Sequence, residues 1–200
     1  MGFFLQQKRE VMTEPSIFDI IADLDTPVSA CMKLRDLQPR FLLESVEGGE
    51  RLARYSFLGF GAASTVRLEH NDLYLDEKVI GQPKSQIEYL QSLRELLSVA
   101  PQLTPSIDDL PFSGGLVGVS GYDIIRLFEE LPTLTKPQEN LPRAIFVMPT
   151  SVLVFDHLTR RAALLHAGSE TARKQLKQQV IQCLRASLPC LLYTSPSPRD

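Results

Sequence analysis

The order of the expected secondary-structure elements constrains the fold of this chain most strongly. Helical periodicity appears in a few stretches only, whereas short runs rich in leucine, aromatic and β-branched residues recur between turn signals. Helices are expected at residues 16–24, 84–97, 123–130 and 170–188, and strands at residues 28–34, 41–43, 55–60, 65–69, 73–75, 144–148, 151–155 and 162–167. Strands outnumber helices and do not alternate with them one for one. The pattern therefore predicts an α+β fold with a mainly antiparallel, sandwich-like β-sheet and flanking helices.

The first two elements are predicted from a capping residue and from an alternating pattern. Ser16 is expected to cap a helix that runs to Leu24, because apolar residues follow it at helical spacing. A proline disfavours helical angles in the residue before it, so Thr26 is expected to end this helix. Apolar and polar residues then alternate from Val28 to Leu34, which predicts a half-buried strand.

A glycine-rich apolar segment, residues 112–121, precedes the short helix expected at residues 123–130. Its glycine spacing lacks the Lys-Ser/Thr ending of a phosphate-binding loop and does not match the dinucleotide-binding pattern. Close packing of strands is therefore the expected reason for these glycines. Tyr122 is expected to be half-buried, and Asp123 is expected to cap the helix.

Composition and charge exclude several classes of protein. The 200-residue chain is 44% hydrophobic and 22% charged, which is typical of a soluble globular protein. Its net charge of −3 lacks the basic surplus of a nucleic-acid-binding protein, and no stretch approaches the roughly 20 apolar residues of a membrane span. The three cysteines form no CxxC pair, which indicates reduced thiols in a cytoplasmic protein.

Three segments of different character divide the chain. Residues 1–15 have no apolar core of signal-peptide length and are expected to be an N-terminal extension. Residues 16–190 hold the expected helices and strands and are expected to form the domain. Residues 191–200 contain two prolines that cannot continue a helix, so they are either a flexible tail or a non-native segment joined to a truncated coding sequence. We favour the non-native tail.

Four blocks of sequence resemble one family of chorismate-using enzymes, anthranilate synthase component I. The blocks are residues 25–30 (DTPVSA), 41–59 (FLLESVEGGERLARYSFLG), 112–118 (FSGGLVG) continuing to 121–123 (GYD), and 154–157 (VFDH). The second block is long and specific, whereas each of the others would be weak alone. The chain is therefore similar to the N-terminal part of this family, ending before the catalytic half.

The resemblance implies a reaction, a metal and partners. Members of the family condense chorismate with ammonia to give anthranilate and pyruvate, and the ammonia comes from glutamine through a separate amidotransferase subunit. Mg²⁺ and chorismate bind to the C-terminal half, whose ligands have no matching positions here. No catalytic residue and no metal ligand is therefore assigned to this chain, and the chain alone is expected to be inactive.

L-Tryptophan inhibits the family by binding partly to the Leu-Glu-Ser block, which implies contacts from Leu43, Glu44 and Ser45 in this chain. The residue types suit such a ligand: a carboxylate accepts from an ammonium group, and a hydroxyl donates to a carboxylate. An apolar slot would hold the indole ring. From spacing alone, the simpler interpretation is a polar strand end at which Glu44 pairs with Arg51 or Arg54 on the surface.

Arg51 and Arg54 lie close in sequence to three glutamates, which leaves two interpretations of the pair. In one, the arginines order the regulatory loop through charge-assisted hydrogen bonds. In the other, they belong to a solvated cluster in which each ion pair contributes roughly 0–1 kcal/mol. A metal site among the glutamates is disfavoured, because the arginines would compete for the carboxylates.

Two other functions compete with this assignment. Component I of aminodeoxychorismate synthase, from folate synthesis, shares the fold and a related Leu-Glu-Ser region, but residues 44–57 resemble the anthranilate branch more closely. A free-standing regulatory module that binds an amino acid is the second alternative. The reading frame beyond residue 188 in the parent gene would distinguish that module from a truncated synthase.

Overall fold

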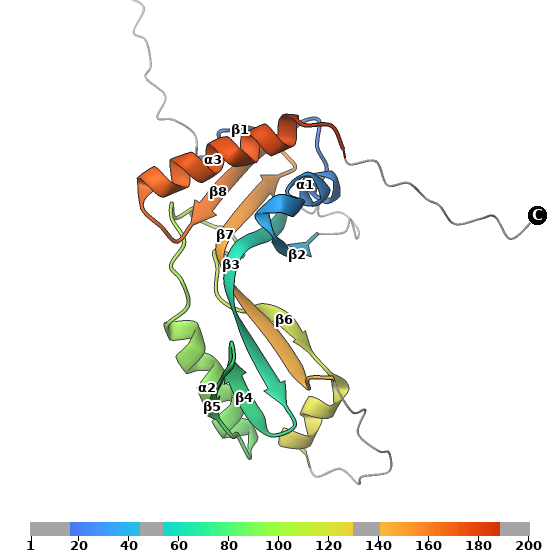
Figure 1. Ribbon diagram of the computed structural model, residues 1–200, viewed down its shortest axis with the longest axis vertical. Coiled ribbons are helices and arrows are strands. Elements are labelled where there is room, and N and C mark those ends of the chain that lie inside the picture. The colour runs from blue at the N-terminus through green and yellow to red at the C-terminus, as the bar shows by residue number, and fades with distance from the viewer. Residues whose placement is uncertain (1–16, 45–53, 130–140, 189–200) are drawn as a thin grey trace, which may run out of the picture.

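The computed structural model describes residues 17–44, 54–129 and 141–188 (Figure 1). The helices are α1 (Pro27–Lys33), α2 (Gln86–Ser98) and α3 (Glu170–Arg185), with 3-10 helices η1 (Arg35–Leu37) and η2 (Tyr122–Leu127). The strands are β1 (Ile20–Ile21), β2 (Pro39–Leu43), β3 (Tyr55–Glu69), β4 (Asp72–Leu75), β5 (Lys78–Gly81), β6 (Val117–Ser120), β7 (Ala144–Asp156) and β8 (Arg161–His166).

These strands form one bent antiparallel sheet, so the predicted α+β class with mainly antiparallel pairing is confirmed. The sheet has the order β1-β8-β7-β3-β4-β5, with β2 paired to β3 and β6 paired to β7. Strands β3 and β7 pair from Tyr55 and Asp156 at one end to Leu68 and Ala144 at the other. They connect the upper half of the molecule, with α1 and α3, to the lower half, with α2 and β6 (Figure 1).

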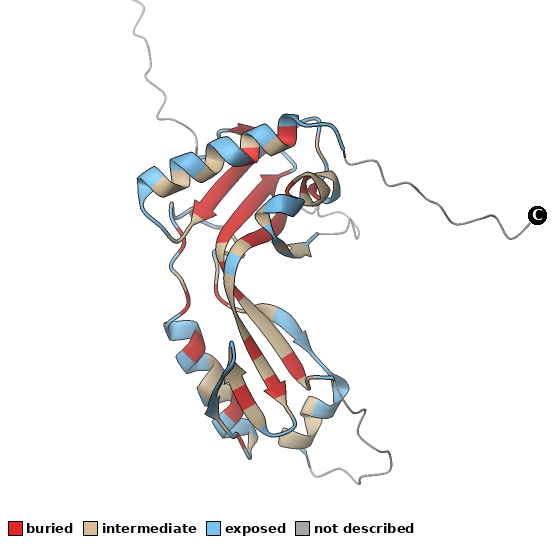
Figure 2. Cartoon of the chain, viewed as in Figure 1, coloured by how far each residue is buried: buried red, intermediate tan, exposed pale blue. Residues whose placement is uncertain are grey.

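Helices α1 and α3 cover one face of the upper half of the sheet. Alternate residues of β3 and β7, such as Leu58 and Leu153, are fully buried beneath Ala30 of α1 and Val180 of α3 (Figure 2). Burial of each leucine or valine side chain contributes roughly 1.5–3 kcal/mol. This core fixes the ends of β3 and β7 from which the candidate site is built.

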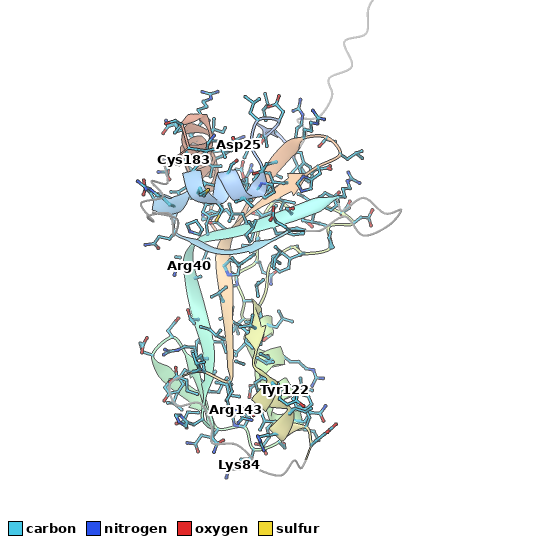
Figure 3. The ribbon with its side chains drawn as sticks, turned by 90° about the vertical axis from the view of Figure 1, so that its right-hand side faces the viewer. Asp25, Arg40, Lys84, Tyr122, Arg143 and Cys183 are labelled. Atoms are coloured by element: carbon cyan, nitrogen blue, oxygen red, sulfur yellow. The ribbon has the colours of Figure 1, made fainter. Side chains whose placement is uncertain are left out.

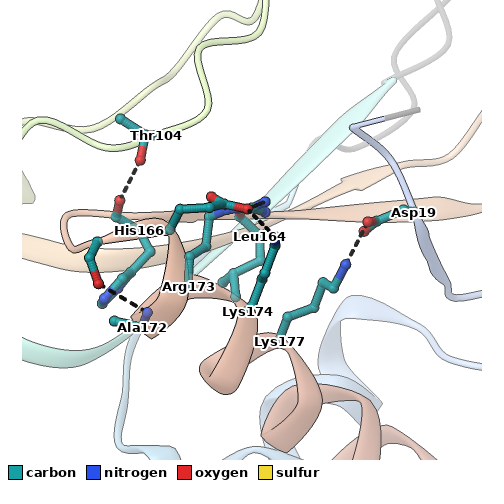
Figure 4. Close-up of polar contacts among 10 residues, drawn as sticks. Asp19, Thr104, Leu164, His166, Ala172, Arg173, Lys174 and Lys177 are labelled. Atoms are coloured by element: carbon teal, nitrogen blue, oxygen red, sulfur yellow. Dashed lines mark hydrogen bonds and ion pairs between the residues drawn. The ribbon is translucent and has the colours of Figure 1, made fainter. Parts of the chain in front are cut away.

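Polar contacts hold α3 in place across the sheet. Lys177 Nζ donates to Asp19 Oδ2 at 2.6 Å, and Arg173 Nη1 donates to the carbonyl oxygen of Leu164 at 3.4 Å (Figure 4). The hydroxyl of Thr104 donates to the backbone oxygen of His166 at 3.2 Å, so the loop that precedes β6 is attached to β8 (Figure 4). Arg173 and Thr104 thus attach α3 and the loop before β6 to β8, and Lys177 attaches α3 to the segment before β1.

Two further clusters complete the core. In the lower half, Tyr89 and Leu96 of α2 pack on Val66 and Leu68 of β3. In the upper half, the face opposite α1 and α3 carries a cluster that includes Phe57, and loop residues cover part of it. Each half of the molecule therefore has its own core on the shared pair of long strands.

The first two predicted elements are wrong, in opposite senses. The expected helix at residues 16–24 is instead an extended segment, in which Ile20 pairs with Ala162 as part of β1; residue 16 lies outside the described residues. The expected strand from Val28 is helix α1. Thr26 begins this helix with a reciprocal capping box to Ser29, and proline fits at the first helical position.

Four smaller expectations also differ from the structure. The strands expected at residues 55–60 and 65–69 are one continuous strand, β3, and the two strands expected at residues 144–155 are also one, β7. Tyr122 is 82% exposed rather than half-buried. Asp123 does not cap η2, whose N-cap is Gly121 without a side-chain hydrogen bond, and it pairs with Arg126 at 3.3 Å. The hairpin between β3 and β4, helix α2 and strand β8 lie where the sequence predicts them.

Gly118 confirms the prediction that close strand packing explains a glycine of the apolar segment. A Cβ atom at this position would collide with the backbone of Ile145 and Phe146 on β7. Gly114 and Gly115 have a different reason, because both have positive φ angles, of 126° and 108°.

We expect Gly118→Ala to lower the free energy of unfolding by roughly 1–3 kcal/mol, because backbone atoms cannot move aside as a flexible side chain can. Gly81→Ala is the matched control, since a Cβ at Gly81 has no atom within 4 Å. Denaturant titration of both variants measures the difference. Equal stability of the two variants would contradict the packing argument.

Candidate functional site

The end of β2 carries two of the three predicted tryptophan contacts. Leu43 is the last residue of β2, lies opposite Phe57 of β3, and is partly exposed. Glu44 follows it directly and is exposed. Ser45 and Arg51, the other predicted residues of this loop, lie outside the described residues. The position of this strand end therefore determines where the loop begins.

A glycine and an aromatic ring set the position of β2 against β3. Phe41 pairs with Gly59, and a Cβ atom at Gly59 would overlap the phenyl ring of Phe41. The same ring packs edge-to-face with Phe112 at a centroid distance of 6.1 Å, and Phe112 packs on Phe57 at 5.5 Å. Residues of the second and third family-like blocks thus pack together beside the strand end.

Arg54, where the described chain resumes before β3, pairs with a buried carboxylate of β7. Its Nη2 donates to Asp156 Oδ2 at 3.0 Å and its Nε donates to Oδ1 at 3.3 Å. The side chain of Arg54 is 49% exposed, whereas that of Asp156 is 2% exposed. The described partner of Arg54 is therefore Asp156, and the surface pairing of Arg54 with Glu44 is not present.

The partners of Asp156 determine its charge state. Burial alone would raise the pKa of this carboxyl, but the hydrogen bonds from Arg54 and from the backbone N–H of Leu158 outweigh burial and lower the pKa below its ordinary value. Asp156 is therefore an anion at neutral pH. The pKa of Arg54 is raised, chiefly by its hydrogen bond to Asp156.

Neighbouring residues of both strands add a second polar contact and a ring contact. Ser56 Oγ lies 2.8 Å from His157 Nε2 and is buried, so the pair joins β3 to β7 and offers no exposed nucleophile. The guanidinium carbon of Arg54 lies 4.8 Å from the centroid of the Tyr55 ring, a cation–π contact. The contact with Ser56 gives the His157 side chain a structural role.

A pocket of about 260 Å³ lies beside this cluster. Asp156 and His157 line it together with the loop before α1, including Asp25 and Thr26, and the turn before β8. Asp25 pairs with Lys33 Nζ at 2.8 Å. Figure 3 shows Asp25 at the upper end of the molecule, far from Tyr122 and Arg143.

Three of the four family-like blocks therefore meet at one end of the sheet. The second block supplies Arg54 and Ser56, the fourth supplies Asp156 and His157, and the first supplies Asp25. Sequence reasoning identified these blocks but missed the pairing of Arg54 with Asp156, which are 102 positions apart. The available signal was the block VFDH, which contains Asp156 but would be weak alone.

The described residues offer little for a metal or a membrane. They contain no group of three or more His, Cys, Asp or Glu side chains that could hold a metal ion. Within the described ranges, no helix is both long and apolar enough to cross a membrane. Cys31 and Cys183 carry free thiols, and burial raises the pKa of Cys31.

The sequence pattern of the chorismate binding enzymes matches residues 38–199, so the chain belongs to this family. Within it, the chain is similar to anthranilate synthase component 1. The Thermus thermophilus protein is 38% identical over 151 residues, which are 75% of this chain and 31% of the relative. The Acetivibrio thermocellus protein is 32% identical over 152 residues, which are 76% of this chain and 30% of the relative.

A solved structure supports the same family. The crystal structure of anthranilate synthase component I from Streptococcus pneumoniae matches with a TM-score of 0.56 and 25% identity, covering 85% of this chain and 37% of that chain. This chain thus spans about a third of the length of the relatives it matches. What the similarity shows is the family and the fold of this part.

We expect Asp156→Asn to lower the free energy of unfolding by roughly 1–3 kcal/mol at neutral pH, since Arg54 loses its charged partner. Because the folded-state pKa of Asp156 lies below its ordinary value, its stabilisation is present above about pH 4. The stabilisation is lost as pH falls through the folded-state pKa. Denaturant titrations of the wild type and the variant between pH 7 and 3 measure both effects.

Asp36→Asn is the control for this experiment, because Asp36 forms an exposed ion pair with Arg35. Such pairs contribute little to stability. The role given to Asp156 would be refuted by equal stability of the two variants at neutral pH, or by a difference from wild type that persists undiminished in acid.

Proposed function

We propose that this chain is the tryptophan-feedback part of an anthranilate synthase component I. The observation that carries the proposal is the meeting of three family-like blocks at the end of the β3–β7 pair, where Asp156 holds Arg54. The relatives reported above bear the name anthranilate synthase component 1, which favours the anthranilate branch over aminodeoxychorismate synthase. A free-standing amino-acid-binding module remains the second candidate.

In this proposal, L-tryptophan binds where β2 ends. Glu44 accepts from the ammonium group, the hydroxyl of Ser45 donates to the carboxylate, and Leu43 contacts the indole ring. The loop between β2 and β3 then has both its ends fixed, one by the packing of Phe41 on Gly59 and the other by the Arg54–Asp156 ion pair. Arg54 thus positions the loop, and Arg51 is proposed to order it further.

The parent enzyme is proposed to convert chorismate and ammonia to anthranilate and pyruvate in the cytoplasm. Its ammonia would come from glutamine through an amidotransferase subunit. Mg²⁺, when bound, would neutralise carboxylates of chorismate. The described residues hold no cluster suited to this ion, so its ligands are assigned to another part of the parent and no chemical step is assigned to this chain.

A hybrid enzyme tests the feedback assignment, with residues 17–188 replacing the matched segment of the Thermus thermophilus protein. We expect it to form anthranilate and to be inhibited by L-tryptophan. Ser45→Ala should raise the tryptophan concentration for half inhibition by about tenfold or more, because a hydrogen bond to a charged group is lost. Anthranilate fluorescence measures both activity and inhibition.

Ser98→Ala is the matched control, because the hydroxyl of Ser98 donates to a carbonyl on α2, in the other half of the molecule. An active hybrid whose inhibition is unchanged by Ser45→Ala would contradict the feedback assignment. A hybrid that unfolds cooperatively but forms no anthranilate would contradict the synthase assignment.

The chain on its own is predicted to be inactive, since the described residues contain no group of three or more His, Cys, Asp or Glu side chains that could hold Mg²⁺. Purified chain with chorismate, ammonia and Mg²⁺ should give no more anthranilate fluorescence than a protein-free mixture. The chain contains no tryptophan, so its own fluorescence will interfere little. Product above that background would show that this part contains a catalytic site.

A further inference from the structure

Strand β6 in the lower half of the sheet has one paired edge and one open edge. It pairs with β7 through Val117 opposite Val147 and Val119 opposite Ile145. No other strand of the described residues pairs with it. Its outer edge therefore presents backbone N–H and C=O groups that a further strand can pair with.

The side chains of this corner form an apolar surface on one face of the sheet. Ala144 and Phe146 of β7 belong to the core beneath α2, and side chains alternate between faces along a strand. Ile145 and Val147 therefore lie on the other face, together with their register partners Val119 and Val117; we call these four residues the β6–β7 face. Val119 is 66% exposed, so this apolar face is incompletely covered by the described chain.

The sequence of β6 lacks the features that usually protect an exposed edge. Edge strands commonly carry charges, prolines or bulges, or are very short. Strand β5 begins with Lys78, and β1 has two residues, whereas β6 reads Val-Gly-Val-Ser. An uncharged, regular edge beside an apolar face is typical of a surface that another segment covers.

Tyr122 extends the exposed surface just beyond β6. Its side chain is 82% exposed and lies at the lower end of the molecule (Figure 3). Phe112 and Leu116, from the same family-like block, pack in the cores, so packing within the chain accounts for them. Packing among the described residues does not account for Val119 or Tyr122. Val119 directly follows the first part of the block, and Tyr122 lies in its second part.

The length of the relatives indicates what covers this surface. This chain spans 31% of the Thermus thermophilus protein and 37% of the Streptococcus pneumoniae chain, so about two thirds of a component I polypeptide lies outside the match. We propose that a strand from that remaining part of the polypeptide pairs with the open edge of β6, and that its flanking residues cover the β6–β7 face. Backbone hydrogen bonds would provide the pairing, and the four apolar side chains would provide the buried contact.

Hydrogen exchange of the chain and of the hybrid described above tests this proposal without measuring activity. The open-edge amides of residues 117–120 should exchange at least about tenfold more slowly in the hybrid than in the chain alone. Val119→Lys should leave the melting temperature of the chain unchanged and lower that of the hybrid by at least about 5 °C, because the lysine would be buried without a partner.

Ile87→Lys is the control, since Ile87 is exposed on α2. It should change neither melting temperature. Equal exchange of residues 117–120 in the two proteins, or a Val119→Lys hybrid as stable as the Ile87→Lys hybrid, would overturn the proposal. A chain that dimerises until Val119 is replaced, while the hybrid is unaffected, would instead identify a second copy as the occupant and would also overturn it. These readouts are independent of inhibition by tryptophan.

Discussion

The antiparallel pairing of β3 with β7 is the interaction on which the rest of the structure depends. Each strand contributes to all three core clusters: β3 through Phe57, Leu58 and Val66, and β7 through residues paired with or near them. Both strands are long enough to serve the upper and the lower half of the molecule. A change in their register by one residue would exchange the two faces and disrupt all three clusters together.

The same pairing creates the candidate site. Tyr55 lies directly opposite Asp156, and the backbone N–H of His157 donates to the carbonyl oxygen of Arg54 at 2.9 Å. The polar groups at this end are therefore held by the strand ladder and do not depend on a loop for their position. This explains how a buried carboxylate and a half-exposed arginine keep a fixed geometry at the base of the loop between β2 and β3.

The sequence predicted those parts of the fold in which local pattern and tertiary contact agree. The hairpin of β3 and β4 and the amphipathic helix α2 are of this kind. The prediction is wrong at α1, because Thr26 and Ser29 form a capping box that begins a helix at the proline expected to end one. Over only seven residues, an alternation of apolar and polar residues does not distinguish a strand from a helix. Ala30 and Leu34 are both buried and four positions apart, which also fits one face of a helix.

The partner of Arg54 could not be predicted for a different reason. Local charge proximity favours the nearby glutamates, and nothing in the spacing indicates a carboxylate 102 positions away. Only the register of β3 against β7 brings that carboxylate to the base of the loop. Glu44, by contrast, follows β2 in the place its sequence suggests, because the packing of Phe41 on Gly59 fixes β2 locally.

The ion pair of Arg54 with Asp156 also limits how a ligand at this end can act. A ligand shifts a conformational equilibrium only by the difference between its affinities for the two states. Since Asp156 is buried in the sheet and its charge is stabilised by Arg54, separating the pair would leave a buried carboxylate without its cationic partner, which is costly. Binding at the proposed tryptophan site would therefore act with the Arg54–Asp156 ion pair and the β3–β7 ladder kept in place.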